Sequence, residues 1–217
     1  MENRMNKSIA EIVLILGWND MCDSGTYPDR NEPGGYDLYS ELMADFIRDV
    51  RKDLSVPKMP FVIGVIGVDG EGKMLELRKA MAAPALMNEF KGTVAAVQTA
   101  PYWDGPLEAI AAKHAKMKVG YYLKKGGFPA KNMVRSYPVA YALRKEYWDT
   151  PPKDRKMTKA EQKEYLKEYR AKIISPEEDA LWKRGASNAG YHYYGSAKIL
   201  GQIGKAFAEA ALKMEKK

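Results

Sequence analysis

The chain has 217 residues, of which 46% are hydrophobic, so it is long enough to bury the core of one domain. Its formal net charge is +7, and its single cysteine, Cys22, excludes an internal disulfide and a cysteine-rich zinc site. No apolar run reaches the roughly 18 residues that cross a bilayer, so no transmembrane segment is expected.

Three apolar runs in the first half of the chain predict strands. Apart from Glu11 and Thr93, residues 10–17, 61–68 and 92–97 are apolar, which is typical of strands buried on both faces. The segments between them have helical periodicity, and a strand–helix–strand order favours right-handed crossovers and a parallel sheet. The sequence therefore predicts an α/β fold, with ligand-binding loops at the C-terminal ends of the strands.

In total, five segments predict helices, including the two that lie between the strands. They are indicated by apolar residues spaced three and four apart or by Glu/Lys pairs. Pro84 interrupts the second segment, and Ser175 followed by Pro176 is a favourable start for the fourth. The five segments are 36–53, 73–90, 158–171, 176–184 and 194–214.

The basic charge of the chain belongs to one region. Residues 113–172 hold 17 of the 35 Lys and Arg residues but only 6 of the 28 Asp and Glu residues. We interpret residues 1–217 as a single domain that carries a basic, irregular insertion at about 119–172. A solvated lysine-rich surface and a polyanion-binding surface are both consistent with this insertion, although no recognised nucleic-acid module is present.

The first candidate site follows the first predicted strand, in the sequence Gly17-Trp18-Asn19-Asp20. An oxyanion needs fixed hydrogen-bond donors, and a glycine amide with an asparagine side chain supplies two. The same residue types also form ordinary turns at strand ends, so the motif alone leaves both interpretations open.

The second candidate is His192, which lies in the sequence Gly-Tyr-His-Tyr-Tyr-Gly at 190–195. A neutral imidazole near pH 7 can take a proton from a hydroxyl, but a structural histidine packed among tyrosines is an equally good interpretation. The other histidine, His114, is expected on an exposed basic helix face. Nothing in the chain has the spacing of His or Cys metal ligands, so neither a metal nor a cofactor is expected.

Aromatic and polar residues at the strand ends are candidates for a carbohydrate pocket. Aromatic faces pack on sugar rings, and carboxylates accept hydrogen bonds from hydroxyls; core packing at a loop is the alternative interpretation. The candidate substrate-binding residues are Trp18, Asp20, Gln98, Tyr102, Trp103 and Asp104.

The order and spacing of these motifs resemble the SGNH hydrolases, and in particular their sialate O-acetylesterase-like carbohydrate acetylesterases. Residues 17–20 have the G-x-N-D form of the third block of that family. The resemblance covers most of the chain, in the segments 25–28, 46–51, 59–64, 78–81, 97–99, 190–193 and 195–198.

The resemblance implies a three-layer α/β/α, flavodoxin-like fold and a serine acyl-enzyme mechanism without a cofactor. It makes Gly17 and Asn19 oxyanion donors and His192 the general base. Two features depart from the family. Ala189 stands where an aspartate usually precedes the histidine by three residues, and the serine block that should precede the first strand is not identifiable. The chain thus resembles an SGNH domain without its first strand–helix portion.

The expected function is carbohydrate O-acetyl ester hydrolysis. A substitute nucleophile, Cys22 or Ser24, is conceivable, as is completion of the site by a partner segment or a second copy of the chain. The alternatives are an inactive remnant with a carbohydrate-binding cleft and a polyanion binder that uses the basic surface. The family is often exported, but the chain has no signal peptide of its own, so its compartment stays open.

Overall fold

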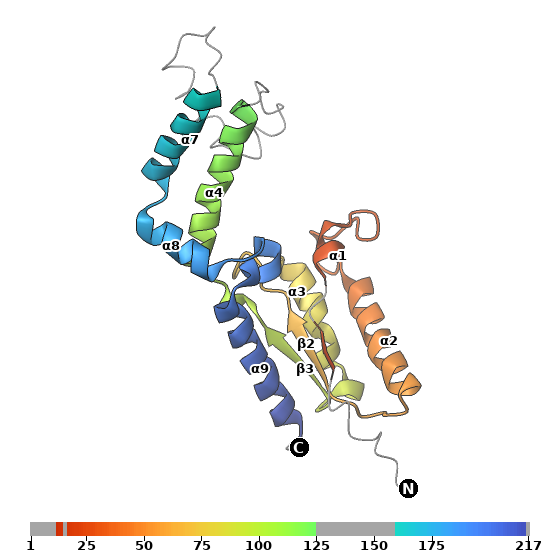
Figure 1. Ribbon diagram of the computed structural model, residues 1–217. Coiled ribbons are helices and arrows are strands. Elements are labelled where there is room, and N and C mark those ends of the chain that lie inside the picture. Colours follow the sequence, from red (N-terminus) through yellow and green to blue (C-terminus); the bar gives the residue numbers. More distant parts are fainter. Residues whose placement is uncertain (1–11, 15–16, 125–158, 216–217) are drawn as a thin grey trace. The chain divides into compact units, whose positions relative to one another are not determined.

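The computed structural model describes residues 12–14, 17–124 and 159–215 (Figure 1). The chain divides into two compact units: Met1–Asp104 together with Asn188–Lys217 form the first, and Gly105–Ser187 form the second. The predicted basic insertion lies within the second unit, but its part between 125 and 158 is outside the described residues. Among the described residues, no helix is sufficiently long and apolar to cross a membrane.

The first unit contains a parallel three-stranded sheet in the order β1-β2-β3. The strands are β1 (Ile12–Leu14), β2 (Phe61–Val65) and β3 (Val94–Gln98). Their register places Phe61 opposite Ile12 on one side and opposite Val94 on the other. All three predicted strands are confirmed, and so is the parallel α/β character of the chain. β2 is buried along its whole length, as its unbroken apolar run predicts.

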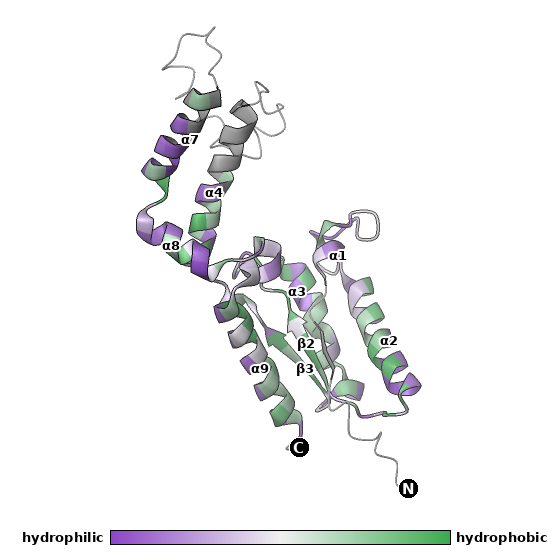
Figure 2. Cartoon of the chain, viewed as in Figure 1, coloured by the Kyte–Doolittle hydropathy of each residue, from purple (hydrophilic) through white to green (hydrophobic). Residues whose placement is uncertain are grey.

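The helices of the first unit cover this sheet. They are α1 (Trp18–Cys22), α2 (Asp37–Asp53), α3 (Leu75–Ala82) and α9 (Ala197–Glu215), with the short 3-10 helices η2 (Ala83–Leu86), η3 (Asn88–Phe90), η4 (Ala100–Tyr102) and η5 (Gly190–Gly195). α3 and α9 both contact β2 and β3, and α2 packs on α3. Hydrophobic residues on β2, β3 and the inner stripe of α9 form the core (Figure 2), in which Ile47, Phe61, Met81 and Ile199 are fully buried.

Two predicted helices have different bounds in the structure. The segment 73–90 is helical only to residue 82 and then continues as η2 and η3, because Pro84 removes a backbone donor. The last helix begins at Ala197 rather than at 194. The backbone of Tyr193 and Tyr194 has positive φ, which an α-helix cannot contain.

The second unit contains three helices among the residues described: α4 (Gly105–Lys124), α7 (Lys159–Ile173) and α8 (Pro176–Gly185). α4 contacts both α7 and α8, and α7 is mostly hydrophilic (Figure 2). A capping box begins α8: the Glu178 amide donates to Ser175 Oγ, and the Ser175 amide donates to the Glu178 carboxylate. The predicted helices at 158–171 and 176–184 are confirmed.

Two expectations for the second unit are wrong. Residues 119–124 are not irregular but continue α4, which ends at Lys124. His114 is not on an exposed face. Its ring lies 4.7 Å from that of Trp182, its Nε2 atom is buried, and burial lowers its pKa.

Candidate functional site

The Gly-Trp-Asn-Asp motif forms a sharp turn from β1 into α1. Gly17 is buried and adopts φ 119°, a conformation that favours glycine, and its carbonyl accepts the amide of Met21 at 3.0 Å. Trp18 and Asp20 are half-buried, whereas Asn19 is exposed. The turn therefore leaves the Asn19 side chain accessible at the C-terminal end of β1, as a donor to a ligand would require.

Three tyrosines surround Asp20, the last residue of this motif. The hydroxyl of Tyr27 donates to Asp20 Oδ1 at 3.3 Å. Burial, and then the charge of Asp20, raise the pKa of Tyr27 to about 12 and also raise the pKa of Tyr39. Tyr36 packs on Tyr27 with ring centroids 4.9 Å apart. Asp20 thus accepts a hydrogen bond from the loop that follows its own motif, and its predicted role in substrate binding stays a prediction.

The loop that carries His192 is anchored to the sheet by the next residue, Tyr193. The buried amide of Gly67 donates to the Tyr193 hydroxyl at 2.8 Å. The same hydroxyl lies 2.7 Å from Thr99 Oγ1, which itself donates to the carbonyl of Val65 at 2.8 Å. Since the Thr99 proton is used in that bond, Tyr193 is the donor to Thr99. One phenol therefore joins η5 to the residues that follow β2 and β3.

The segments after β2 and β3 meet closely below this anchor. A Cβ atom placed on Gly67 would lie 2.2 Å from the backbone nitrogen of Ala100, so only glycine fits there. Tyr193 and Tyr194 adopt φ of 52° and 59°, which is costly for non-glycine residues. Their buried side chains offset that cost, because Trp103 packs against both rings, at centroid distances of 6.1 and 5.0 Å.

His192 itself is exposed and is held by Asn188. Its Nδ1 atom lies 3.1 Å from Asn188 Oδ1, and the same oxygen accepts the amide of Ala189 at 2.7 Å. The amide oxygen of Asn188 can only accept, so Nδ1 donates to it, and in the neutral imidazole Nε2 then carries the lone pair. This tautomer is the one that a general base needs, and a neutral asparagine fixes it without the aspartate that the resemblance leads one to expect.

Aromatic rings connect the two motifs. The Trp18 and Tyr191 rings lie 5.5 Å apart, and Tyr191 lies 4.5 Å from the ring of His192. The structure thereby places the Gly17–Asp20 turn and the His192 loop side by side at one edge of the sheet, although more than 170 residues separate them in the sequence.

The remaining predicted substrate-binding residues have mixed positions. Trp103 is half-buried against the tyrosines of η5, and Asp104 is buried and paired with Lys198 Nζ at 2.8 Å. These contacts correspond to the core-packing alternative. Tyr102 is half-buried and Gln98 is exposed at the end of β3, where it lines a separate cavity next to α3.

Neither of the two substitute nucleophiles is hydrogen-bonded to His192. Cys22 and Ser24 are both exposed, and the hydrogen bond of the imidazole goes to Asn188. Within the described ranges no three His, Cys, Asp or Glu side chains gather as metal ligands would. The structure thus brings the candidate base close to the candidate oxyanion donors, without Cys22 or Ser24 on the imidazole.

The sequence interpretation did not identify Tyr193 or Thr99 as supports of the site, and it gave Asn188 no positive role. The spacing of Asn188, four residues before His192, is a usable signal, because a turn of that length returns the side chain to the ring. No comparable signal exists for Tyr193, whose partner Gly67 is 126 residues away.

Comparisons with family models, with curated proteins and with solved structures gave no match to this chain.

Proposed function

We propose that this chain carries the base and oxyanion half of an ester hydrolase site that removes acetyl groups from carbohydrate hydroxyls. His192 acts as the general base. The Gly17 amide and the Asn19 side chain stabilise the oxyanion of the tetrahedral intermediate. The observation that carries the proposal is the contact of the two motifs through Trp18 and Tyr191.

The state of the imidazole supports this assignment. The hydrogen bond to Asn188 leaves the Nε2 lone pair available, and the His192 side chain is exposed, so a hydroxyl can approach it. The half-buried ring of Trp18 and the exposed ring of Tyr191 next to it offer an apolar surface to a sugar ring.

The proposal includes a complete three-layer α/β/α fold around the sheet of the first unit. A three-layer, flavodoxin-like SGNH domain would place its nucleophilic serine on a strand next to β1, close to Gly17. In the proposal this serine comes from a segment of this chain outside the described residues, in the same copy or in a second copy of the chain, and it attacks the acetyl carbonyl while His192 accepts its proton. The acyl-enzyme is then hydrolysed by water, which His192 activates in turn.

The test is labelling of the full chain with a fluorophosphonate, mapped by mass spectrometry, beside turnover of p-nitrophenyl acetate. We expect one labelled serine and a loss of turnover in His192→Ala. His114→Ala is the matched control, because it removes the only other histidine and is expected to keep turnover. Absence of a label, or equal turnover of the wild type and His192→Ala, would refute the proposal.

One observation favours a second candidate, a carbohydrate-binding protein without turnover. In the ranges that the structure describes, the hydrogen bond of the His192 ring goes to Asn188, and neither Cys22 nor Ser24 is hydrogen-bonded to the ring. This candidate predicts that acetylated oligosaccharides quench tryptophan fluorescence without being hydrolysed. Trp18→Ala should abolish the quenching, and neither the wild type nor His192→Ala should release acetate.

A further inference from the structure

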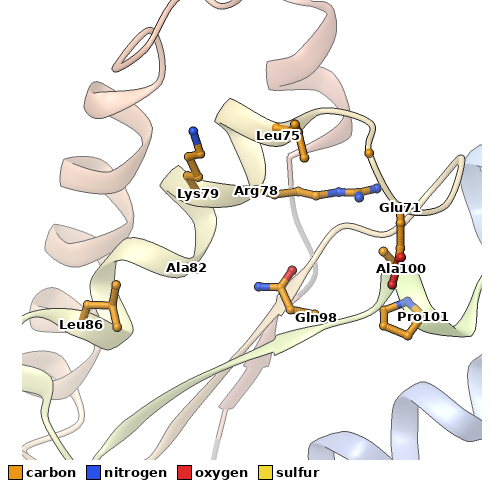
Figure 3. Close-up of a pocket in the computed structure, with 10 residues that line it drawn as sticks. Glu71, Leu75, Arg78, Lys79, Ala82, Leu86, Gln98, Ala100 and Pro101 are labelled. Carbon is orange, nitrogen blue, oxygen red and sulfur yellow. The ribbon is translucent and has the colours of Figure 1, made fainter.

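A cavity of about 530 Å³ lies in the first unit between α3 and the C-terminal end of β3 (Figure 3). Leu75 and Ala82 of α3, Leu86 of η2 and Pro101 of η4 give it largely apolar walls. Its volume is within the range of small-molecule sites in proteins. It is lined by none of the residues Gly17, Asn19 and His192, so the proposed ester site does not account for it.

One buried cation lines this cavity. Arg78 projects from α3 and is 7% exposed (Figure 3). Its Nη2 atom donates to the carbonyl of Val68 at 3.0 Å, whereas its Nε atom is buried and has no hydrogen-bond partner. No ion pair joins Arg78 to an acidic side chain among the described residues. Burial accordingly lowers its pKa.

This state of a guanidinium is unfavourable by itself. Arginine has five N–H donors and a charge that stays in the folded protein, and a buried charge is costly unless it is paired. The other arginine buried in the first unit, Arg51, donates to the carbonyls of Met59 and Thr93 and to Thr93 Oγ1. Arg78 has only the carbonyl of Val68 as an acceptor, and the cavity lies beside its guanidinium.

The acidic groups near Arg78 form no ion pair with it, and the nearby charges of Asp69 and Glu71 raise its pKa by less than burial lowers it. Lys79 is exposed and pairs with Glu76 at 2.6 Å. Glu71 lines the cavity as well, but it is exposed and forms no ion pair with Arg78. Gln98, exposed at the end of β3, is the remaining polar side chain and can donate or accept.

We propose that this cavity binds a small organic carboxylate. Its carboxylate group pairs with the guanidinium of Arg78, a planar fork that matches it. Its apolar body lies against Leu75, Ala82 and Pro101. A single negative charge suits the site better than a phosphate does, because the carboxylate of Glu71 lines the cavity and repels a dianion more strongly.

The experiment is an NMR titration of the ¹⁵N-labelled full chain with sodium benzoate, with benzamide as the neutral probe of the same shape and with inorganic phosphate as the alternative anion. We expect saturable shifts of the Gln98 and Ala82 amides with benzoate, and none with benzamide. Arg78→Met should weaken benzoate binding at least about tenfold, since it removes a charge-assisted hydrogen bond. Arg48→Met is the matched control: it removes an exposed arginine on α2 and should leave binding unchanged.

Arg78→Met also removes the hydrogen bond to the carbonyl of Val68, so a second variant tests the cavity without that loss. Ala82→Phe fills the cavity without removing the guanidinium, and it should abolish the benzoate shifts while the rest of the spectrum stays folded. The proposal is overturned if benzoate gives no saturable shift, if benzamide binds equally well, if phosphate binds more tightly, or if either folded variant binds benzoate as the wild type does.

Discussion

The Tyr193 hydroxyl gives the sharpest test of how the His192 loop is held. Tyr193→Phe removes one oxygen atom and keeps the ring that packs against Trp103. The buried amide of Gly67 then loses its acceptor, whereas Thr99 Oγ1 keeps its bond to the carbonyl of Val65. An unsatisfied buried donor costs about 1–3 kcal/mol, so we expect the free energy of unfolding to fall by about 2 kcal/mol.

For a chain of this size the loss corresponds to a decrease in Tm of about 4–8 °C. Urea unfolding followed by tryptophan fluorescence measures the free energy, and hydrogen exchange of the Gly67 amide reports the site itself. The control is Tyr191→Phe, whose side chain is 49% exposed and which should change stability by less than about 0.5 kcal/mol. If Tyr193→Phe is as stable as this control and the Gly67 amide stays protected, the anchoring role of the hydroxyl is refuted.

Three further predictions concern the same unit. Gly67→Ala should lower the free energy of unfolding by about 3 kcal/mol or more, because its Cβ would overlap Ala100. Its control is Gly201→Ala, at an open helical position, which should leave the free energy of unfolding unchanged or raise it by up to about 1 kcal/mol. Urea unfolding measures both variants. Arg51→Met should cost about 2–4 kcal/mol in the same assay, since it leaves the buried carbonyl of Met59 without its donor, whereas the carbonyl of Thr93 keeps the amide of Phe61. Tyr27 should contribute stability below pH 10 that is lost between about pH 10 and pH 12, because its pKa is raised from 10.0 to about 12 in the folded state. Alkaline unfolding monitored by circular dichroism should therefore depend less steeply on pH in Tyr27→Phe than in the wild type. The same pH profile in both proteins would contradict this prediction.

Hydrophobic patterning was sufficient to predict the main elements of the first unit. The strand at 61–65 is an unbroken apolar run and the strand at 94–98 is apolar up to Gln98. The stripe of α9 buries Ile199, Ile203 and Phe207 as its periodicity indicates. The start of α8 could be predicted from Ser175 for a local reason, since a capping box depends on residues three apart.

The candidate site was predictable only in part. The Gly17 and His192 motifs carry a signal in their own residues, but their contact depends on the Trp18–Tyr191 packing, which no local pattern encodes. The left-handed backbone of Tyr193 is likewise unexpected, because positive φ is usually indicated by glycine or asparagine. Only its long-range hydrogen bonds make that conformation favourable.

The division of the chain has a consequence for the order in which it folds. The first unit is interrupted between Asp104 and Asn188, so β2 and β3 leave the ribosome long before the segment that closes over their ends. The Thr99–Tyr193 bond spans 94 residues. Loop closure becomes only slowly more costly with length, by about 0.6 kcal/mol for each doubling, so the interruption affects timing more than final stability. During synthesis the nascent sheet must wait for α9 with part of its apolar surface uncovered, which makes this interval the one in which the chain is most prone to aggregate.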